Sequence, residues 1–206
     1  MSVSRETLIS TYFSERREEI DRYAEILKTW GIERGLIGPK EGERIWDRHI
    51  ANCIPLTTLI SQNASIIDIG SGAGLPGIVI ALVRPDLKVT LLEPLQRRFD
   101  FLEEVVEELG IEIAIKRGKA ESFKGAFNYV TARAVAPLPK LASISWHLVL
   151  GGGSLLAIKG EGASTELEAA RADIPKIFKK VAESKIHEIK IGELPLARVI
   201  ELKKAG

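Results

Sequence analysis

The chain has 206 residues, a net charge of +1, 45% hydrophobic and 28% charged residues, which suits one folded domain rather than a disordered chain. This charge does not by itself mark a nucleic-acid binder, and the single cysteine, Cys53, excludes an internal disulfide and any cysteine-rich zinc site. The three histidines are scattered, so we expect no metal. No membrane-length apolar run and no signal-peptide core is visible, which predicts a cytoplasmic protein.

The N-terminal part is predicted to be helical. Residues 5–29 carry apolar side chains at helical spacing, and Trp30-Gly31 predicts the end of that helix. Glycines and a proline in residues 35–42 predict a loop, followed by a second helix from Glu41 to about Cys53. We expect residues 1–55 to be a helical extension of a single domain, 1–206, packed as a cap near its binding crevice.

A glycine-rich stretch, IIDIGSGAGLPG at residues 66–77, organises the rest of the chain. It predicts a buried strand at 65–69, a tight glycine turn, and a buried helix at about 75–83. Such a turn brings free N–H groups of a helix N-terminus to a ligand. Gly72, Gly74 and Gly77 fit the dinucleotide fingerprint, whereas Asp68, Gly70, Gly72 and Gly74 fit the first motif of S-adenosylmethionine-dependent methyltransferases. A glycine turn without a ligand is the third reading.

Alternating strands and helices follow, which is typical of a parallel sheet with helical crossovers. The last two strands are joined by a link too short for a helix, so they are predicted to form an antiparallel hairpin. We therefore expect a seven-stranded, mostly parallel sheet with helices on both faces and strand 198–203 antiparallel beside strand 154–159. The predicted strands are 88–93, 112–116, 127–132, 154–159, 185–191 and 198–203, and the predicted helices are 97–109, 137–150 and 164–181, with Pro175 breaking or kinking the last.

Acidic residues mark the predicted carboxyl edge of the sheet, where such sheets bind ligands. Glu93 ends a strand and is either an acceptor for ribose hydroxyls or an exposed turn residue. Asp68 either holds the glycine turn or meets the charged amino group of a cofactor. Ala120-Glu121 follows the third strand and either borders an adenine or merely starts a helix.

Two cations, Arg133 and Lys159, follow the fourth and fifth strands at the same edge. They are predicted to contact phosphate or a cofactor carboxylate, the alternative being ordinary solvated side chains; Arg48, Arg97 and Arg98 are weaker candidates. No Asn/Asp-Pro-Pro-aromatic motif follows the fourth strand, and Cys53 lies outside the sheet, so we assign no catalytic residue. The target atom is expected to be nucleophilic by itself.

These motifs together resemble one family. The segment DIGSGAGLPG at 68–77, Arg48-His49-Ile50, Arg133-Ala134 and Lys159-Gly160 are similar to motifs of RsmG (GidB), the bacterial 16S ribosomal RNA guanine-N7 methyltransferases. Asn52 and Cys53 stand where the family usually has Asp and Ser.

The resemblance implies a class I methyltransferase fold, S-adenosylmethionine as cofactor, and a guanosine of 16S ribosomal RNA, position 527 in the family, as substrate. It implies cofactor contacts at Gly70, Leu75, Glu93, Ala120, Glu121 and Arg133. The N7 atom carries a lone pair and no proton, so in-line attack on the methyl group needs no general base. A monomer acting on the small ribosomal subunit, or on its assembly intermediate, is expected. A non-catalytic RNA- or ribosome-binding protein of the same fold is the alternative, and an oxidoreductase is a weaker one.

Overall fold

One sheet of seven strands organises the computed structural model, which describes residues 4–206. The strands are β1 (Ser65–Ile69), β2 (Lys88–Glu93), β3 (Ala114–Arg117), β4 (Phe127–Arg133), β5 (Val149–Lys159), β6 (Val181–Ile189) and β7 (Ala197–Lys204). Their spatial order is β3-β2-β1-β4-β5-β7-β6, with β1 to β5 parallel and β7 antiparallel to both neighbours. The predicted sheet is confirmed, including β7 beside β5. The order reverses at β1, between β2 and β4, which is where sheets of this kind open a crevice.

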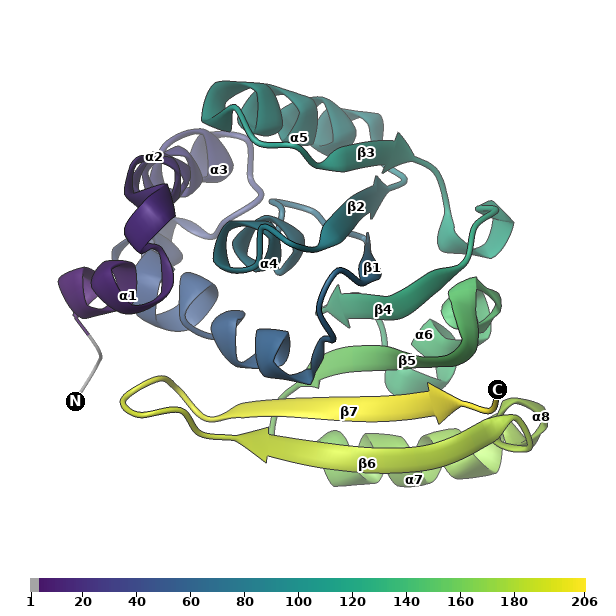
Figure 1. Ribbon diagram of the computed structural model, residues 1–206. Coiled ribbons are helices and arrows are strands. Elements are labelled where there is room, and N and C mark those ends of the chain that lie inside the picture. The colour runs from purple at the N-terminus through teal and green to yellow at the C-terminus, as the bar shows by residue number, and fades with distance from the viewer. Residues whose placement is uncertain (1–3) are drawn as a thin grey trace.

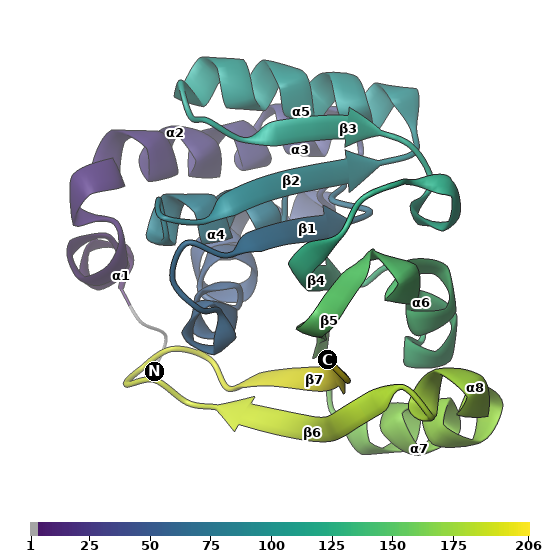
Figure 2. The ribbon, with the colours of Figure 1, turned by 45° about the vertical axis from the view of Figure 1, so that its right-hand side comes forward.

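Helices cover both faces of the sheet, as Figure 1 and the turned view in Figure 2 show. One face carries the N-terminal helices with α4 and α5, and the other carries α6, α7 and α8. Each face of the sheet has its own hydrophobic core. Because side chains alternate along a strand, Ile66 belongs to the core under the N-terminal helices, and its neighbour Ile67 belongs to the core under α6 and α7. The helices are α1 (Arg5–Tyr12), α2 (Arg17–Lys28), α3 (Trp30–Glu33), α4 (Gly77–Val83), α5 (Gln96–Leu109), α6 (Leu138–Ser145), α7 (Ala163–Asp173) and α8 (Pro175–Phe178).

The N-terminal helices differ from the single helix predicted for residues 5–29. The backbone leaves the helical region at Phe13 (φ −133°, ψ 26°), which is itself buried. This break lets α1 and α2 bury separate apolar faces in one core. Trp30-Gly31 does not end the helical region but begins the short helix α3. Residues Pro39–Arg44 and Ile45–Ile50 form a 3₁₀ turn and a π-helical turn in place of the predicted second helix.

The predicted helix over 137–150 is too long. It ends at Ser145, and the chain enters β5 at Val149, before the three glycines. A Cβ atom at Gly153 would stand 2.4 Å from the carbonyl oxygen of Asn128 on β4. Gly153 therefore lets β5 lie close to β4. The glycines belong to this strand contact and do not mark the end of a helix, as the sequence pattern predicted. The predicted break at Pro175 is confirmed, because α7 stops at Asp173 and Pro175 opens α8. Another difference is in length: β6 begins at Val181 rather than at residue 185.

The N-terminal segment is tied to α5 by charged contacts. Arg22 and Arg34 form ion pairs of 2.7 and 2.6 Å with Glu108 and Glu104. Both guanidinium groups also stack near the ring of Trp30, at 5.5 and 5.6 Å from its centroid. Because its apolar side chains share the core of α4 and α5, this segment packs as part of the same body.

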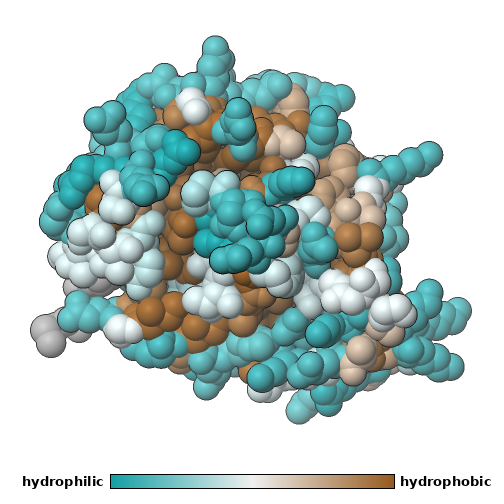
Figure 3. Space-filling model, viewed as in Figure 1, coloured by the Kyte–Doolittle hydropathy of each residue, from teal (hydrophilic) through white to brown (hydrophobic). Residues whose placement is uncertain are grey.

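The surface is mostly polar in the view of Figure 1, with apolar side chains in strips between charged ones (Figure 3). Within residues 4–206, no helix is long and apolar enough to cross a membrane. Among the exposed large apolar side chains are Val135 and Leu196, which both line the cavity described below.

Candidate functional site

The glycine turn leaves β1 with three residues at positive φ, namely Gly70, Gly72 and Gly74. At Gly72 (φ +57°) an added Cβ would meet nothing closer than the carbonyl oxygen of Gly70 at 3.8 Å, so this side of the turn is open. At Gly74 (φ +97°) it would lie 2.3 Å from a methyl carbon of Ile78 and 3.0 Å from the hydroxyl of Tyr23. The turn thus packs one side against the protein and offers the other to a ligand.

Asp68 is almost fully buried behind this turn. Its Oδ2 accepts a hydrogen bond of 3.1 Å from the backbone N–H of Gly77, while Oδ1 has no partner among the described residues. Burial raises the pKa of this carboxyl group to about 7. One oxygen therefore holds the start of α4, as one of the two predicted roles requires, and the other is left for a donor that the protein itself does not supply.

Glu93 joins the end of β2 to the glycine turn. Its Oε2 accepts from the N–H of Gly72 at 2.9 Å, and its Oε1 accepts from the N–H of Leu95 at 3.0 Å. The side chain is 1% exposed, so the reading of Glu93 as an exposed turn residue is wrong. A carboxylate held in this way keeps lone pairs for further donors.

The other predicted cofactor contacts flank the same turn. Leu75 is buried directly after Gly74, and its N–H donates to the carbonyl oxygen of Ser71 at 3.2 Å. Ala120 is buried in a 3₁₀ turn after β3, and Glu121 beside it is exposed. That turn follows Gly118, whose N–H donates to the carbonyl oxygen of Glu93. The carboxyl ends of β2 and β3 therefore lie side by side.

Arg133 ends β4 and contacts His49, for which the sequence predicts no role. Its Nη2 lies 2.6 Å from Nδ1 of His49, and its Nη1 donates to the carbonyl oxygen of His49 at 3.2 Å. The guanidinium group only donates, so Nδ1 must be the acceptor and the ring proton must sit on Nε2. That nitrogen lies 3.1 Å from Glu41, which also pairs with Arg48 at 2.9 Å. Burial and the charge of Arg133 lower the pKa of His49.

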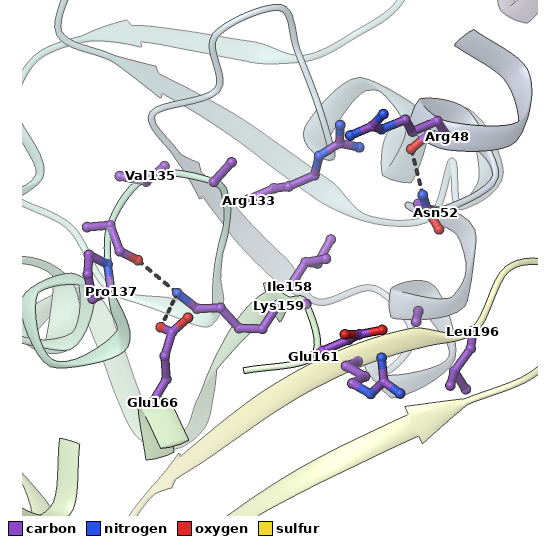
Figure 4. A pocket seen from close by; sticks show the side chains of 15 residues that line it. Arg48, Asn52, Arg133, Val135, Pro137, Ile158, Lys159, Glu161, Glu166 and Leu196 are labelled. Atoms are coloured by element: carbon purple, nitrogen blue, oxygen red, sulfur yellow. Dashed lines mark hydrogen bonds and ion pairs between the residues drawn. The ribbon is translucent and has the colours of Figure 1, made fainter. Parts of the chain in front are cut away.

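A cavity of about 630 Å³ opens at the carboxyl ends of β4 and β5 (Figure 4). The backbone there turns at Ala134, which adopts a positive φ of +56°, a strain that recurs at functional sites. Val135 links the cavity to the glycine turn, since its Cγ2 would stand 3.0 Å from a Cβ at Gly70. The cavity is bordered by Arg48, Asn52, Arg133, Val135, Lys159 and Leu196.

Lys159 borders this cavity but is not a free cation. Its ammonium group lies 2.6 Å from Oε2 of Glu166 and 2.8 Å from the carbonyl oxygen of Ala136, and its side chain is 11% exposed. The alternative reading of Lys159 as an ordinary solvated cation is therefore wrong, because α7 brings a carboxylate that pairs with it, while its contact with phosphate or a cofactor carboxylate stays a prediction. Arg48 does border the cavity, whereas Arg97 and Arg98 lie on α5 and are not part of its lining.

Two contacts at the site escaped the sequence analysis. Tyr23 of α2 donates from its hydroxyl to the carbonyl oxygen of Ala73 in the glycine turn, at 2.9 Å. His49 holds Arg133 across 84 residues of sequence. The amphipathic pattern of α2 indicates that Tyr23 is buried, and the Arg48-His49 motif singles out His49, but neither pattern names the distant partner.

Comparison with known proteins agrees with this geometry. A family model described as rRNA small subunit methyltransferase G (GidB) matches residues 16–196. A ribosomal RNA small subunit methyltransferase G of Kineococcus radiotolerans is 52% identical over 79% of this chain and 65% of its own. The protein of that name from Thermobifida fusca is 51% identical over 83% and 73%. A solved methyltransferase structure from Pyrococcus furiosus superposes with a TM-score of 0.62 at 17% identity, covering 94% of this chain and 100% of that one.

The fold, the glycine turn with its two buried carboxylates, and these matches lead to one conclusion. The chain belongs to the rRNA small subunit methyltransferase G (GidB) family.

Proposed function

We propose that this protein transfers the methyl group of S-adenosylmethionine to N7 of a guanosine in 16S ribosomal RNA, position 527 in the family. The substrate is the small ribosomal subunit or an assembly intermediate of it, and the protein acts as a monomer without a metal. The observation that carries the proposal is the glycine turn with its two buried carboxylates, which lies next to the 630 Å³ cavity: Val135 lines the cavity and also packs against Gly70 of the turn. The turn and the cavity give two adjoining places, one for a cofactor and one for a base.

The residues at the turn fit the cofactor. Its methionine part has an ammonium group that would satisfy Oδ1 of Asp68, the buried oxygen without a partner. Its ribose hydroxyls suit the remaining lone pairs of Glu93, and Gly72 leaves the space for close approach. Ala120 and Glu121 stand at the adjacent strand end, where the adenine would lie. Arg133 supplies a positive charge for a carboxylate or a phosphate.

For this reaction the protein mainly has to position the cofactor and the guanine base. The cofactor supplies an electrophilic methyl group on sulfur, and N7 of guanine has an exposed lone pair and no proton to lose. The protein therefore has to hold two reactants in line and exclude water, which is where most of the rate gain of such a reaction lies. No general base is needed for this attack.

The decisive experiment maps N7-methylguanosine in 16S ribosomal RNA from cells with and without this protein. It is repeated in vitro with purified protein, labelled S-adenosylmethionine, and small subunits from the deficient cells or naked RNA from them. Loss of the methyl group at one guanosine, restored by the protein, supports the proposal. Binding of RNA and cofactor without transfer would instead indicate the non-catalytic RNA-binding alternative.

A further inference from the structure

A row of hydrogen-bonded side chains runs from Arg133 to the N-terminal segment. Arg133 contacts His49 Nδ1 at 2.6 Å, His49 Nε2 contacts Glu41 Oε2 at 3.1 Å, and Arg48 Nη1 donates to Glu41 Oε1 at 2.9 Å. Glu41 and His49 come from the two irregular helical turns before the sheet, so this row connects the N-terminal segment to the end of β4. His49 is 9% exposed and forms the middle of the row.

All hydrogen bonds of the row can form in only one protonation state of His49. Neutral His49, with its proton on Nε2, accepts from Arg133 and donates to Glu41 at the same time. A proton on Nδ1 would remove the acceptor and place a third positive charge beside Arg133 and Arg48, with Glu41 as the one facing carboxylate. Two further titratable groups lie near Arg133. Cys53 donates to the carbonyl oxygen of His49, and burial raises its pKa to about 11, so it stays neutral. Asp68 interacts electrostatically with Arg133, and burial raises its pKa to about 7.

Arg133 keeps donors for a ligand while it is held. It uses Nη1 on the carbonyl oxygen of His49 and on Cys53, and Nη2 on the imidazole, whereas its Nε has no acceptor among residues 4–206. Because Arg133 also lines the cavity, these unused N–H groups are available to an anionic oxygen there. The backbone carbonyl of residue 49 would remain after substitution, so the imidazole alone supplies the acceptor for Nη2.

We propose that His49, supported by Glu41, is a positioning residue for methyl transfer, holding the guanidinium group of Arg133 ready for an anionic oxygen in the cavity. The proposal rests on the proposed function for its catalytic consequence. The anion is either the carboxylate of the cofactor or a phosphate of the RNA, which share the same chemistry toward arginine.

Methyl transfer to small subunits from deficient cells tests the consequence with three variants. His49→Ala removes the acceptor and lowers kcat/KM about ten- to a hundredfold. The wild-type rate should decline on acidification as His49 takes up a proton. His49→Asn keeps an acceptor oxygen near the position of Nδ1 but cannot titrate, so it should retain most activity and lose this decline. His187→Asn is the matched control, because His187 pairs with Glu201 in the β6–β7 hairpin and leaves Arg133 untouched. Wild-type rates in His49→Ala across the pH range would overturn the proposal.

Two further measurements identify the anion and keep the test independent of activity. Weaker binding of S-adenosylhomocysteine by His49→Ala assigns Arg133 to the cofactor carboxylate, whereas unchanged binding with a raised KM for RNA assigns it to phosphate. Nitrogen NMR of the free protein should show His49 as the Nε2–H tautomer, and Arg133→Met should raise its pKa because Glu41 remains. An Nδ1–H tautomer, or an unchanged pKa in Arg133→Met, would refute the arrangement even if the wild type transfers no methyl group.

Discussion

Gly72 offers the sharpest test of where the cofactor meets the backbone, because the chain contains a matched control. Gly72 and Gly110 have nearly the same φ, +57° and +59°, and an added Cβ is unobstructed at both, with a single contact at 3.8 Å at Gly72 and none within 4 Å at Gly110. Left-handed backbone costs an alanine about 1–2 kcal/mol, of which about 0.4–1 kcal/mol is offset by the reduced freedom of the unfolded chain. Gly72→Ala and Gly110→Ala should therefore lose similar stability, about 0.5–1.5 kcal/mol.

The two variants should differ in ligand binding. The methyl group at position 72 projects into the open space before the turn, where overpacking against a ligand costs about 1–3 kcal/mol, or roughly five- to a hundredfold in affinity. The methyl group at position 110 caps α5 and faces no ligand. Urea unfolding gives the stabilities, and titration calorimetry with S-adenosylhomocysteine gives the affinities. Equal affinity of both variants would refute the placement of the cofactor at the open side of the turn.

Three more substitutions test the buried charges. Glu93→Ala should weaken cofactor binding about ten- to a hundredfold in calorimetry, and a loss below about threefold would make Glu93 a support of the turn only. Lys159→Ala should lower the unfolding free energy by about 1–3 kcal/mol, because it leaves the partly buried Glu166 with only the N–H of Leu138; full stability with a weaker salt dependence of RNA binding would instead support the phosphate role. Asp68 has a folded-state pKa of about 7 against 3.8 in the unfolded chain, so the folded state binds more protons between these values and stability falls as pH rises through that window. Asp68→Asn should flatten this decline in urea unfolding between pH 5 and 8, and an unchanged slope would show that another group causes it.

The sequence was informative wherever the signal is local. A strand, a glycine turn and a helix occupy neighbouring residues in 65–83, so the pattern contains the whole element. Glu93 could be placed at the crevice because strand ends of a parallel sheet meet at one edge. The end of the predicted helix at residue 109 and the antiparallel hairpin follow from short-range rules in the same way.

The errors arise where tertiary contacts decide. The break at Phe13 depends on two helices burying separate faces in a common core, and the start of β5 depends on how closely Gly153 approaches β4. Lys159 looked like a free cation because its partner Glu166 belongs to the following helix and its orientation is not encoded locally. The row from Glu41 to Arg133 joins residues that are far apart in sequence. The spacing of apolar and polar residues along the chain does not predict contacts between such distant residues.

The hydrogen bond from Tyr23 to Ala73 means that the glycine turn depends on a residue fifty positions earlier in the chain. A chain shortened to residues 56–206 would keep every strand, yet the carbonyl oxygen of Ala73 and the side chain of Ile78 would lose the surface that now covers them. The N-terminal helices therefore cannot be exchanged for those of a relative without regard to their contacts with the glycine turn. A replacement N-terminal segment would have to place a hydroxyl group at the position of the Tyr23 hydroxyl. Otherwise the carbonyl oxygen of Ala73 would lose its hydrogen-bond donor.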